Sequence, residues 1–413
     1  MLTKHPFIKT LLNLRGNTRG CVYTEPLWGI PFNLYAPYVS VYMLAFGLAD
    51  SQIGLITTIG LTFQVMWTIL SGAITDKLGR KRTTLIFDII SWSIPCLIWA
   101  AAQNFTYFLV AAIVNSVWRV THNSWTCLLV EDTDPKILVD VYSWVHIAGL
   151  LSAFVSPLTG LLIAQFSLVP TMRGLYLLAF VMMTAKFFAN NALATETEQG
   201  KIRLQETKRQ TIFDILGGYS GVLQEILHSP ALLSVAGLMI ILSISLMVQR
   251  TFWSILVTEK LLIPPEHLAI YPFVRSVTML LFYFLIMPRV RDTQPYKPMA
   301  LGFLGLIVSQ VILIAVPVKS YWLLGVATVL EACSYPTANV LVQKLVVVTV
   351  DAKERARIMA ILNMIMLLFT SPFGWISGKM SEIDRILPFV LMLILFVLGG
   401  VLIWASRRLE VTH

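Results

Sequence analysis

Long apolar runs, each bounded by charged residues, glycine or proline, dominate the chain. A helix that crosses a membrane needs about 20 such residues. The runs lack the apolar–polar alternation of barrel strands, and only helices or closed barrels satisfy their backbone in lipid. The pattern therefore predicts an all-α integral membrane protein with twelve transmembrane helices. The predicted spans are residues 26–46, 53–74, 83–102, 105–130, 141–165, 174–194, 230–257, 267–288, 298–317, 320–348, 357–378 and 386–405.

A charged break separates the first six predicted spans from the last six. It reads TETEQGKIRLQETKRQ and continues into apolar positions spaced as on an amphipathic surface helix. An offset of 215 residues places Ser156-Pro157 of the fifth span on Ser371-Pro372 of the eleventh and keeps the loops in register. The chain is therefore predicted to form two six-helix pseudo-symmetric halves. Their boundaries are residues 1–195, a cytoplasmic linker at 196–229, and residues 230–413.

Composition supports a membrane protein and excludes a soluble globule. Hydrophobic residues make up 57% of the chain and charged residues 13%, against about 25% charged in soluble proteins. The net charge of +9 would suggest nucleic acid in a soluble protein. Here 22 of the 31 Lys and Arg fall on one side of the predicted spans, which orients the chain with both termini cytoplasmic. No nucleic-acid partner is expected.

Other chemistry finds little support in the sequence. The four cysteines lie far apart without a CxxC pair, so neither a metal site nor a disulfide framework is expected. A GxxxxGK(S/T) phosphate loop is missing too, and no cofactor is expected. The first 20 residues carry dispersed cations and read as an interfacial amphipathic stretch.

The loop after the second span carries one specific motif, GAITDKLGRKR, from Gly72 to Arg82. Gly72 would permit close helix approach, Asp76 ends a helix, and Gly79 permits a tight turn. Arg80 and Arg82 would anchor the loop at headgroups. An ordinary positive-inside turn would explain the cations but leaves the ordered Gly, Asp, Gly and Arg spacing unexplained.

This string resembles the loop signature of the major facilitator superfamily, G-x-x-x-D-(R/K)-x-G-(R/K)-(R/K), at every position. The resemblance implies a twelve-helix transporter that works by alternating access. It also implies a cytoplasmic latch of Asp76 and Arg80, closed in the outward-open state, with Glu131 or Asp132 as acidic partner. The second-half copy, residues 287–292, is degenerate, because the offset places Arg291 where the first half has Asp76.

Two further signatures of the superfamily are matched in part, and they place the chain near its drug or metabolite:proton antiporters. In the fourth span, Arg119-Val-Thr-His122-Asn123 keeps the arginine of R-x-x-Q-G. In the fifth span, Pro157 and Gly160 keep one proline and one glycine of G-x-x-x-G-P-x-x-G-G. The resemblance implies that spans 1, 4, 7 and 10 line a central cavity.

Ionisable side chains inside the bilayer are costly and mark functional sites. Glu331, near the midplane of the tenth span, is the best proton-carrying candidate, and Arg119 of the fourth span is the second. A static salt bridge from Glu331 to Arg119 or Arg250 is the alternative. Arg275 and Lys186 read as snorkelling or packing residues. For Asp88, a contact with the loop cations and a role in transport explain the residue equally well.

Polar and aromatic residues of the same spans are candidates for the substrate cavity. Their alternative role is hydrogen bonding between helices, and a packing role is favoured for the histidine. The candidates are Asn33, Tyr35, Tyr38, Asn115, His122, Asn123, Gln249, Arg250, Trp253, Tyr335 and Asn339.

Together these features predict a secondary active transporter of a small organic solute, and proton-coupled export is preferred. Proton-coupled uptake of an anionic or zwitterionic metabolite is the alternative, since Arg119 and Arg250 outnumber Glu331. An intramembrane lipid-modifying enzyme is less favoured, because no HExxH or clustered His/Asp motif occurs. A transport-dead receptor is less favoured because the linker is short. We expect a monomer in the plasma membrane.

Overall fold

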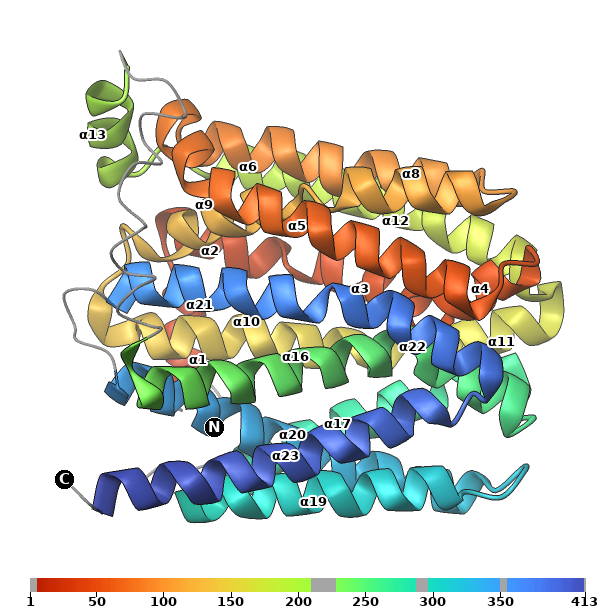
Figure 1. Ribbon diagram of the computed structural model, residues 1–413. Coiled ribbons are helices and arrows are strands. Elements are labelled where there is room, and N and C mark those ends of the chain that lie inside the picture. Colours follow the sequence, from red (N-terminus) through yellow and green to blue (C-terminus); the bar gives the residue numbers. More distant parts are fainter. Residues whose placement is uncertain (1–5, 209–227, 287–295, 350–354, 412–413) are drawn as a thin grey trace. The chain divides into compact units, whose positions relative to one another are not determined.

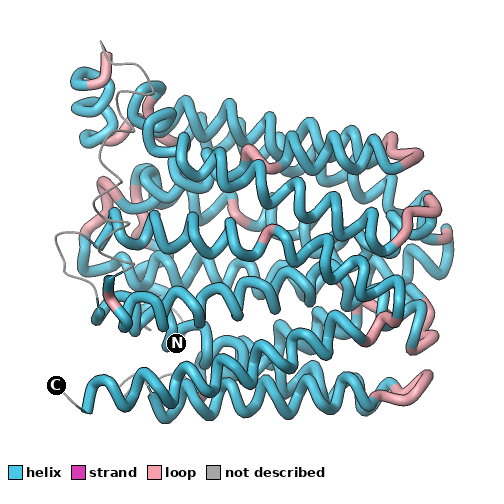
Figure 2. The backbone as a smooth tube through the Cα atoms, viewed as in Figure 1, coloured by secondary structure: helices cyan, strands magenta, loops and turns pink. Residues whose placement is uncertain are grey.

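The computed structural model describes residues 6–208, 228–286, 296–349 and 355–411. Within these ranges the chain is helical and contains no strand (Figure 2). Nine helices in this part of the chain are long and apolar enough to cross a membrane. The fold is thus the predicted all-α membrane bundle. The predicted amphipathic helix of the linker (residues 212–227) and the degenerate motif copy (residues 287–292) lie outside the described residues.

Contacts divide the chain into two compact units. The first unit consists of residues 1–36, 63–159 and 166–217. The second unit consists of residues 37–62, 160–165 and 218–413. Two segments of the predicted first half, 37–62 and 160–165, therefore pack with the second half. Helices α5 (Asp50–Leu78) and α11 (Pro157–Phe166) are shared between the units.

The first unit is built around α12, which packs along α2, α3, α6 and α7. In Figure 1 its helices are coloured from red to green in their order along the chain. Its elements are α1 (Pro6–Leu12), α2 (Gly16–Thr24), α3 (Pro26–Tyr35), α6 (Arg80–Asp88), the π segment η3 (Ile89–Ser93), α7 (Ile94–Ala100), α8 (Phe105–Asn115), α9 (Trp118–Val130), η4 (Pro135–Ile137), α10 (Leu138–Ser152), η5 (Ala153–Val155), α12 (Leu168–Leu193) and α13 (Glu198–Glu206).

In the second unit, α19 packs along α20 and α23, and α16 packs against α20, α21 and α23 (Figure 1). Its elements are η2 (Ala36–Tyr38), α4 (Val39–Ala45), α16 (Pro230–Ile255), the π segment η6 (Leu256–Lys260), η7 (Pro265–His267), α17 (Ile270–Leu285), α19 (Tyr296–Ala315), α20 (Tyr321–Thr349), α21 (Arg355–Thr370), α22 (Pro372–Ile383) and α23 (Leu387–Val411).

Breaks divide several of the predicted spans. Span 4 is interrupted between α8 and α9, and span 1 is divided into α3, η2 and α4. The repeated Ser-Pro pairs mark the same kind of break, since α11 begins at Pro157 and α22 begins at Pro372. A proline fits the first helical turn, where its missing N–H is no loss. The internal repeat therefore extends to local backbone structure.

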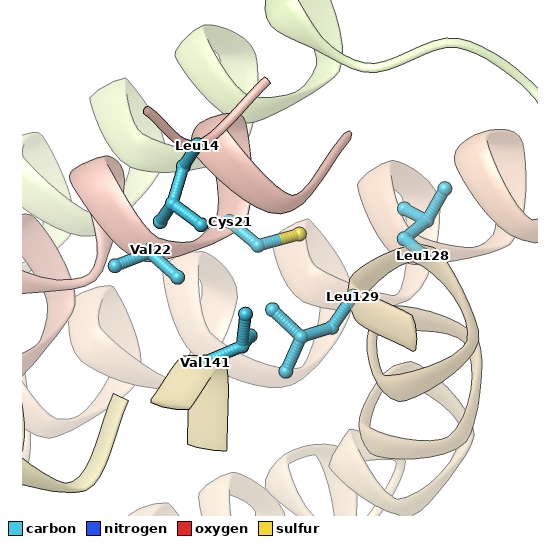
Figure 3. Close-up of a cluster of buried hydrophobic side chains, with 6 residues drawn as sticks. All are labelled: Leu14, Cys21, Val22, Leu128, Leu129 and Val141. Atoms are coloured by element: carbon cyan, nitrogen blue, oxygen red, sulfur yellow. The ribbon is translucent and has the colours of Figure 1, made fainter. Parts of the chain in front are cut away.

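The amino-terminal segment joins the core of the first unit. Side chains of Leu14, Cys21 and Val22 pack against Leu128 and Leu129 of α9 (Figure 3). The prediction of an interfacial stretch for the first 20 residues is wrong for residues 14–20, because Leu14, Asn17, Thr18 and Gly20 are buried in the first unit. Small and apolar residues on α2, rather than cations, determine its position.

Candidate functional site

The turn between α5 and α6 begins the first cluster. Gly79 has φ 84° and ψ 159°, a region that only glycine occupies readily. A Cβ at this position would lie 2.6 Å from Oε2 of Glu196. By contrast, Gly72 is exposed and a Cβ there would meet no described atom within 4 Å. The predicted tight turn is present at Gly79, whereas no close helix approach is seen at Gly72.

Arg80, only 4% exposed, joins three elements at this turn. Its Nη1 donates to Oδ1 of Asp76 at 2.9 Å. Its Nε and Nη2 donate to the carboxylate of Glu131, which follows α9, at 3.1 to 3.2 Å. The bidentate geometry is the strong form of an arginine–carboxylate pair. Among the two acidic partners expected from the resemblance, Glu131 is the one that contacts Arg80.

Its neighbour Asp132 is exposed and has other partners. It accepts from Nδ2 of Asn17 at 3.4 Å and from the backbone N–H of Glu198 at 3.3 Å. The side chain of Arg82 is exposed as well. These two residues of the predicted gate motif therefore lie outside the network of Arg80.

Sequence reasoning missed two members of the network. Glu196 accepts from the backbone N–H groups of Arg80 and Lys81 at 2.8 and 3.1 Å. It thereby satisfies the first N–H groups of α6, which favour a negative charge. The hydroxyl of Thr197 donates to Glu131. Both residues could have been predicted from the acidic TETE segment after the sixth span. That segment returns to the side of the bundle where the loop cations lie.

The environment of Glu131 holds it in the charged form. Burial raises its pKa, but hydrogen bonds from Arg80 and Thr197, together with the charge of Arg80, outweigh that effect and lower the pKa below its usual value. Glu131 is therefore an anion at neutral pH. The cluster of Asp76, Arg80, Glu131, Glu196 and Thr197, which we call the loop network, can act as a fixed electrostatic clamp.

Arg119 belongs to a second cluster of the first unit. Its Nε donates to Oε1 of Gln64 at 3.0 Å, and its guanidinium lies 4.2 Å from the ring centre of Trp118. His122 packs edge-on against Trp118, at 5.6 Å between centres, and is exposed. Asn123 donates to Oγ1 of Thr75 at 3.2 Å. No described carboxylate forms an ion pair with Arg119, so its charge is available to a ligand.

Four other cavity candidates are used in packing. Asn33 donates to the carbonyl of Gly29 in its own helix, and Asn115 donates to the carbonyl of Ser91 at 2.7 Å. Two aromatic candidates are buried. They are Tyr35, packed between Trp99 and Tyr176, and Tyr38, with no exposed surface. The structure thus places Asn33 in a hydrogen bond within its own helix, Asn115 in a hydrogen bond to η3, and the two tyrosines in the buried interior.

The second unit contains a half-buried charge pair. Nε and Nη2 of Arg275 on α17 donate to the two carboxylate oxygens of Glu331 on α20, at 2.8 and 2.9 Å. The partner of Glu331 is therefore Arg275, which the sequence analysis assigned to snorkelling or packing, rather than Arg119 or Arg250. The pair could have been predicted from the sequence, because the two residues lie at the same depth in their spans. Both residues lie about ten residues, or roughly 15 Å, from the starts of their spans, Pro265 and Tyr321.

Glu331, Gln249 and Tyr335 line a cavity of about 10 Å³, which has room for roughly one water molecule. Arg250 is exposed, and no described carboxylate forms an ion pair with it. Trp253 packs edge-on against Tyr271 at 5.5 Å between centres.

Asn339 lies half-buried further along α20. The described residues contain no group of three or more His, Cys, Asp or Glu side chains that could hold a metal ion. The charged side chains within the predicted spans are thus the main candidates for binding a ligand or a proton in this part of the chain.

Comparisons with known proteins agree with this architecture. A family model described as Major Facilitator Superfamily matches residues 28–369. An uncharacterized MFS-type transporter, YqjV of Bacillus subtilis (strain 168), is 24% identical over 187 residues, which are 44% of this chain and 45% of YqjV. The chain thus matches less than half the length of that relative.

Solved structures resemble the chain over nearly all its length. The nucleoside transporter NupG has a TM-score of 0.70 and 17% identity, covering 95% of this chain and 98% of NupG. A bacterial homolog of the human lysosomal transporter Spinster, in an inward-facing and unoccupied conformation, has a TM-score of 0.73 and 12% identity, covering 98% of each chain. The human organic anion transporter MFSD10 has a TM-score of 0.61 and 14% identity, covering 97% and 100%. These likenesses concern the fold.

Proposed function

Because this chain belongs to the Major Facilitator Superfamily, and is thus a multi-pass secondary transporter, we propose that it exports a small organic solute by alternating access coupled to protons. The observation that carries this proposal is the Arg275–Glu331 pair. Both charges lie inside predicted spans, where an ionised group is costly unless it has a function or a partner.

The geometry of this pair supports a switch. In the ionised form, Glu331 accepts both hydrogen bonds of Arg275. Protonation removes the charge and one acceptor, which weakens the bidentate contact. Arg275 is then free to turn towards the cavity shared by Gln249 and Tyr335. A proton on Glu331 and an anionic group of the solute would thus compete for one guanidinium.

The alternative, proton-coupled uptake of an anionic or zwitterionic metabolite, rests on a separate observation. Arg119 has a neutral partner, Gln64, and Arg250 is exposed without a carboxylate partner among the described residues. With Glu331 neutralised by Arg275, these two cations favour a negatively charged solute. That MFSD10 transports organic anions supports testing this class first.

The remaining expectations belong to the same proposal. We infer that the protein acts as a monomer in the plasma membrane with both termini cytoplasmic, that it uses no metal or other cofactor, and that it carries no enzyme activity. The excess of cations on the side of the termini supports the orientation. The bilayer, protons and the solute are then its partners.

Transport in liposomes tests the coupling. The purified chain is reconstituted with a pH-sensitive dye inside, and organic anions, nucleosides and amphipathic cations are added in turn. We expect one class to move protons, and an imposed pH gradient to drive the same class. If no class responds to the gradient, coupling is refuted.

Glu331→Gln tests the carrier, with Asp384→Asn as a matched control at a half-exposed ion pair of the second unit. The glutamine keeps the shape of the side chain but takes up no proton. We expect Glu331→Gln to remove the response to the pH gradient and the control to retain it. Unchanged pH dependence in Glu331→Gln would show that the proton is carried elsewhere.

A further inference from the structure

Three charged side chains of the first unit come together away from both clusters described above. Glu25 lies between α2 and α3, Asp88 ends α6, and Lys186 lies on α12. Lys186 is 6% exposed and Asp88 5%, while the side chain of Glu25 is 14% exposed. Lys186, which the sequence analysis assigned to snorkelling or packing, and Asp88, for which it left a contact with the loop cations and a transport role open, are therefore members of one buried group. We call it the Glu25 cluster.

The three residues lie at one level of the unit. Glu25 is nine residues from the start of α2, Asp88 is eight from the start of α6, and Lys186 is seven from the end of α12. At 1.5 Å per residue, these are depths of about 10 to 14 Å from the end at which α5 turns into α6. A long side chain cannot snorkel to water while it is buried in this way.

The charges of the cluster do not balance. Nζ of Lys186 forms an ion pair with Oε2 of Glu25 at 3.0 Å. Asp88 interacts electrostatically with both residues and lies within hydrogen-bonding reach of the Thr121 hydroxyl, but forms no ion pair with a described cation. Two carboxylates and one ammonium leave one excess negative charge if all are ionised. A buried charge without a partner is costly, and taking up one proton removes it.

The surroundings leave the proton as the available neutraliser. On α2 the cluster interacts with Cys21, whose thiol in turn hydrogen-bonds Asn190 on α12. The rings of Trp125 and Phe187 lie 5.5 and 5.9 Å from the ammonium of Lys186. None of these groups supplies a second positive charge. The indole N–H of Trp125 is buried and has no hydrogen-bond partner among the described residues, so the site has a donor that a water molecule can use.

We propose that the Glu25 cluster is a proton-binding site of the transport cycle, in which Asp88 holds the proton and Lys186 remains paired with Glu25. The proton comes from water and bonds to a carboxylate oxygen of Asp88, which makes the cluster neutral. Its release restores the single negative charge. The π segment η3 begins directly after Asp88, and such segments occur often at functional sites. The link to transport rests on the proposed proton coupling.

The substitution that tests this site is Asp88→Asn. Asparagine has the shape of a protonated aspartate, and the cluster it leaves, Glu25 and Lys186, is neutral. We therefore expect the variant to fold with an unchanged or raised unfolding temperature. Asp140→Asn, at a carboxylate that accepts from Thr10 at 2.8 Å outside the cluster, is the control. If Asp88 only stabilised the fold as an anion, Asp88→Asn would lower the unfolding temperature.

Infrared titration of the purified full chain detects the proton without transport. Because Glu331 is also proposed to bind a proton, the signal of Asp88 is identified by difference. We expect a protonated-carboxyl band that changes with pH in the native chain, in Asp140→Asn and in Glu331→Gln, and that is missing in Asp88→Asn. The inference is overturned if the native chain shows no such signal between about pH 5 and 9, or if Asp88→Asn retains it.

Liposomes then test the coupling. Each coupled proton supports about tenfold accumulation per pH unit, so Asp88→Asn should lower the accumulation about tenfold per pH unit and leave the part that depends on Glu331. Full accumulation in Asp88→Asn would refute a coupling role of the cluster. If the native chain shows the infrared signal but moves no proton with any solute, the proton site stands and the proposed coupling falls.

Discussion

Glu131→Gln is the sharpest test of the loop network. The carboxylate of Glu131 accepts three hydrogen-bonding contacts from Arg80, at 3.1 to 3.2 Å, and one from Thr197. A hydrogen bond to a charged group contributes about 1.5 to 3 kcal/mol. Glutamine keeps one acceptor but presents an NH₂ group to the guanidinium, so one charge-assisted bond and the charge are lost. We expect a destabilisation of about 2 to 3 kcal/mol.

Asp132→Asn is the matched control, because the adjacent carboxylate is exposed and its contacts are 3.3 and 3.4 Å long. We expect its effect to stay within about 0.5 kcal/mol. Unfolding by heat or denaturant in one detergent compares the native chain with both variants. Equal losses in Glu131→Gln and Asp132→Asn would refute the assignment of Glu131 as the partner of Arg80.

The pH dependence gives a second check on Glu131. Its pKa is lowered in the folded state, so its contribution is complete above its usual pKa of about 4.3 and is lost as the pH falls through the lowered value. The stability difference between the native chain and Glu131→Gln should therefore be full at pH 7 and shrink below about pH 4. A difference that is the same at both pH values would contradict the electrostatic explanation.

Two further predictions concern single contacts. Gly79→Ala should destabilise the chain by about 1 to 3 kcal/mol, because its backbone region suits only glycine and the new methyl group would meet Glu196. Gly72→Ala, in open space, should be near neutral in the same unfolding assay. Asp384→Asn should cost less than about 1 kcal/mol, since its ion pair with Lys260 is about 40% exposed. The hydrogen bond from Lys260 lowers the pKa of Asp384, so added salt, or acid below about pH 3.9, should remove this difference.

The fold was predictable because a bilayer leaves few alternatives. Apolar runs of about 20 residues must be helices, and the runs fall where the structure has them. The breaks were harder to predict. Between α8 and α9 the interruption falls at Ser116 and Val117, which carry no strong breaking signal. The burial of α2 was not predicted, because its small and polar residues reduce the hydropathy of this segment although they pack against α12.

Charge pairing could be predicted in the loop and was missed inside the spans, for a geometric reason. The motif places Asp76 and Arg80 four residues apart on one stretch of chain, so their contact follows from spacing alone. The pairs of Lys186 with Glu25 and of Arg275 with Glu331 join different helices. Sequence gives their depth but leaves the rotation of each helix about its axis open. Two residues at equal depth are possible ion-pair partners, but the packing of their helices determines whether the side chains face each other.

These pairings change which charges are available to a solute. Of the four cations that lie away from the ends of the predicted spans, Lys186 and Arg275 have carboxylate partners in their own units. Arg119 and Arg250 have no such partner among the described residues. Since an unpaired cation attracts any anion that reaches it, the proposed transport cycle predicts that a negatively charged solute binds first at Arg119 or at Arg250, and at Arg275 only when Glu331 is protonated. Protons should be sought at Glu331 and the Glu25 cluster. Substitutions of Arg119 or Arg250 should therefore change the affinity for the solute. Substitutions of Glu331 or of Asp88 in the Glu25 cluster should change the pH dependence of transport.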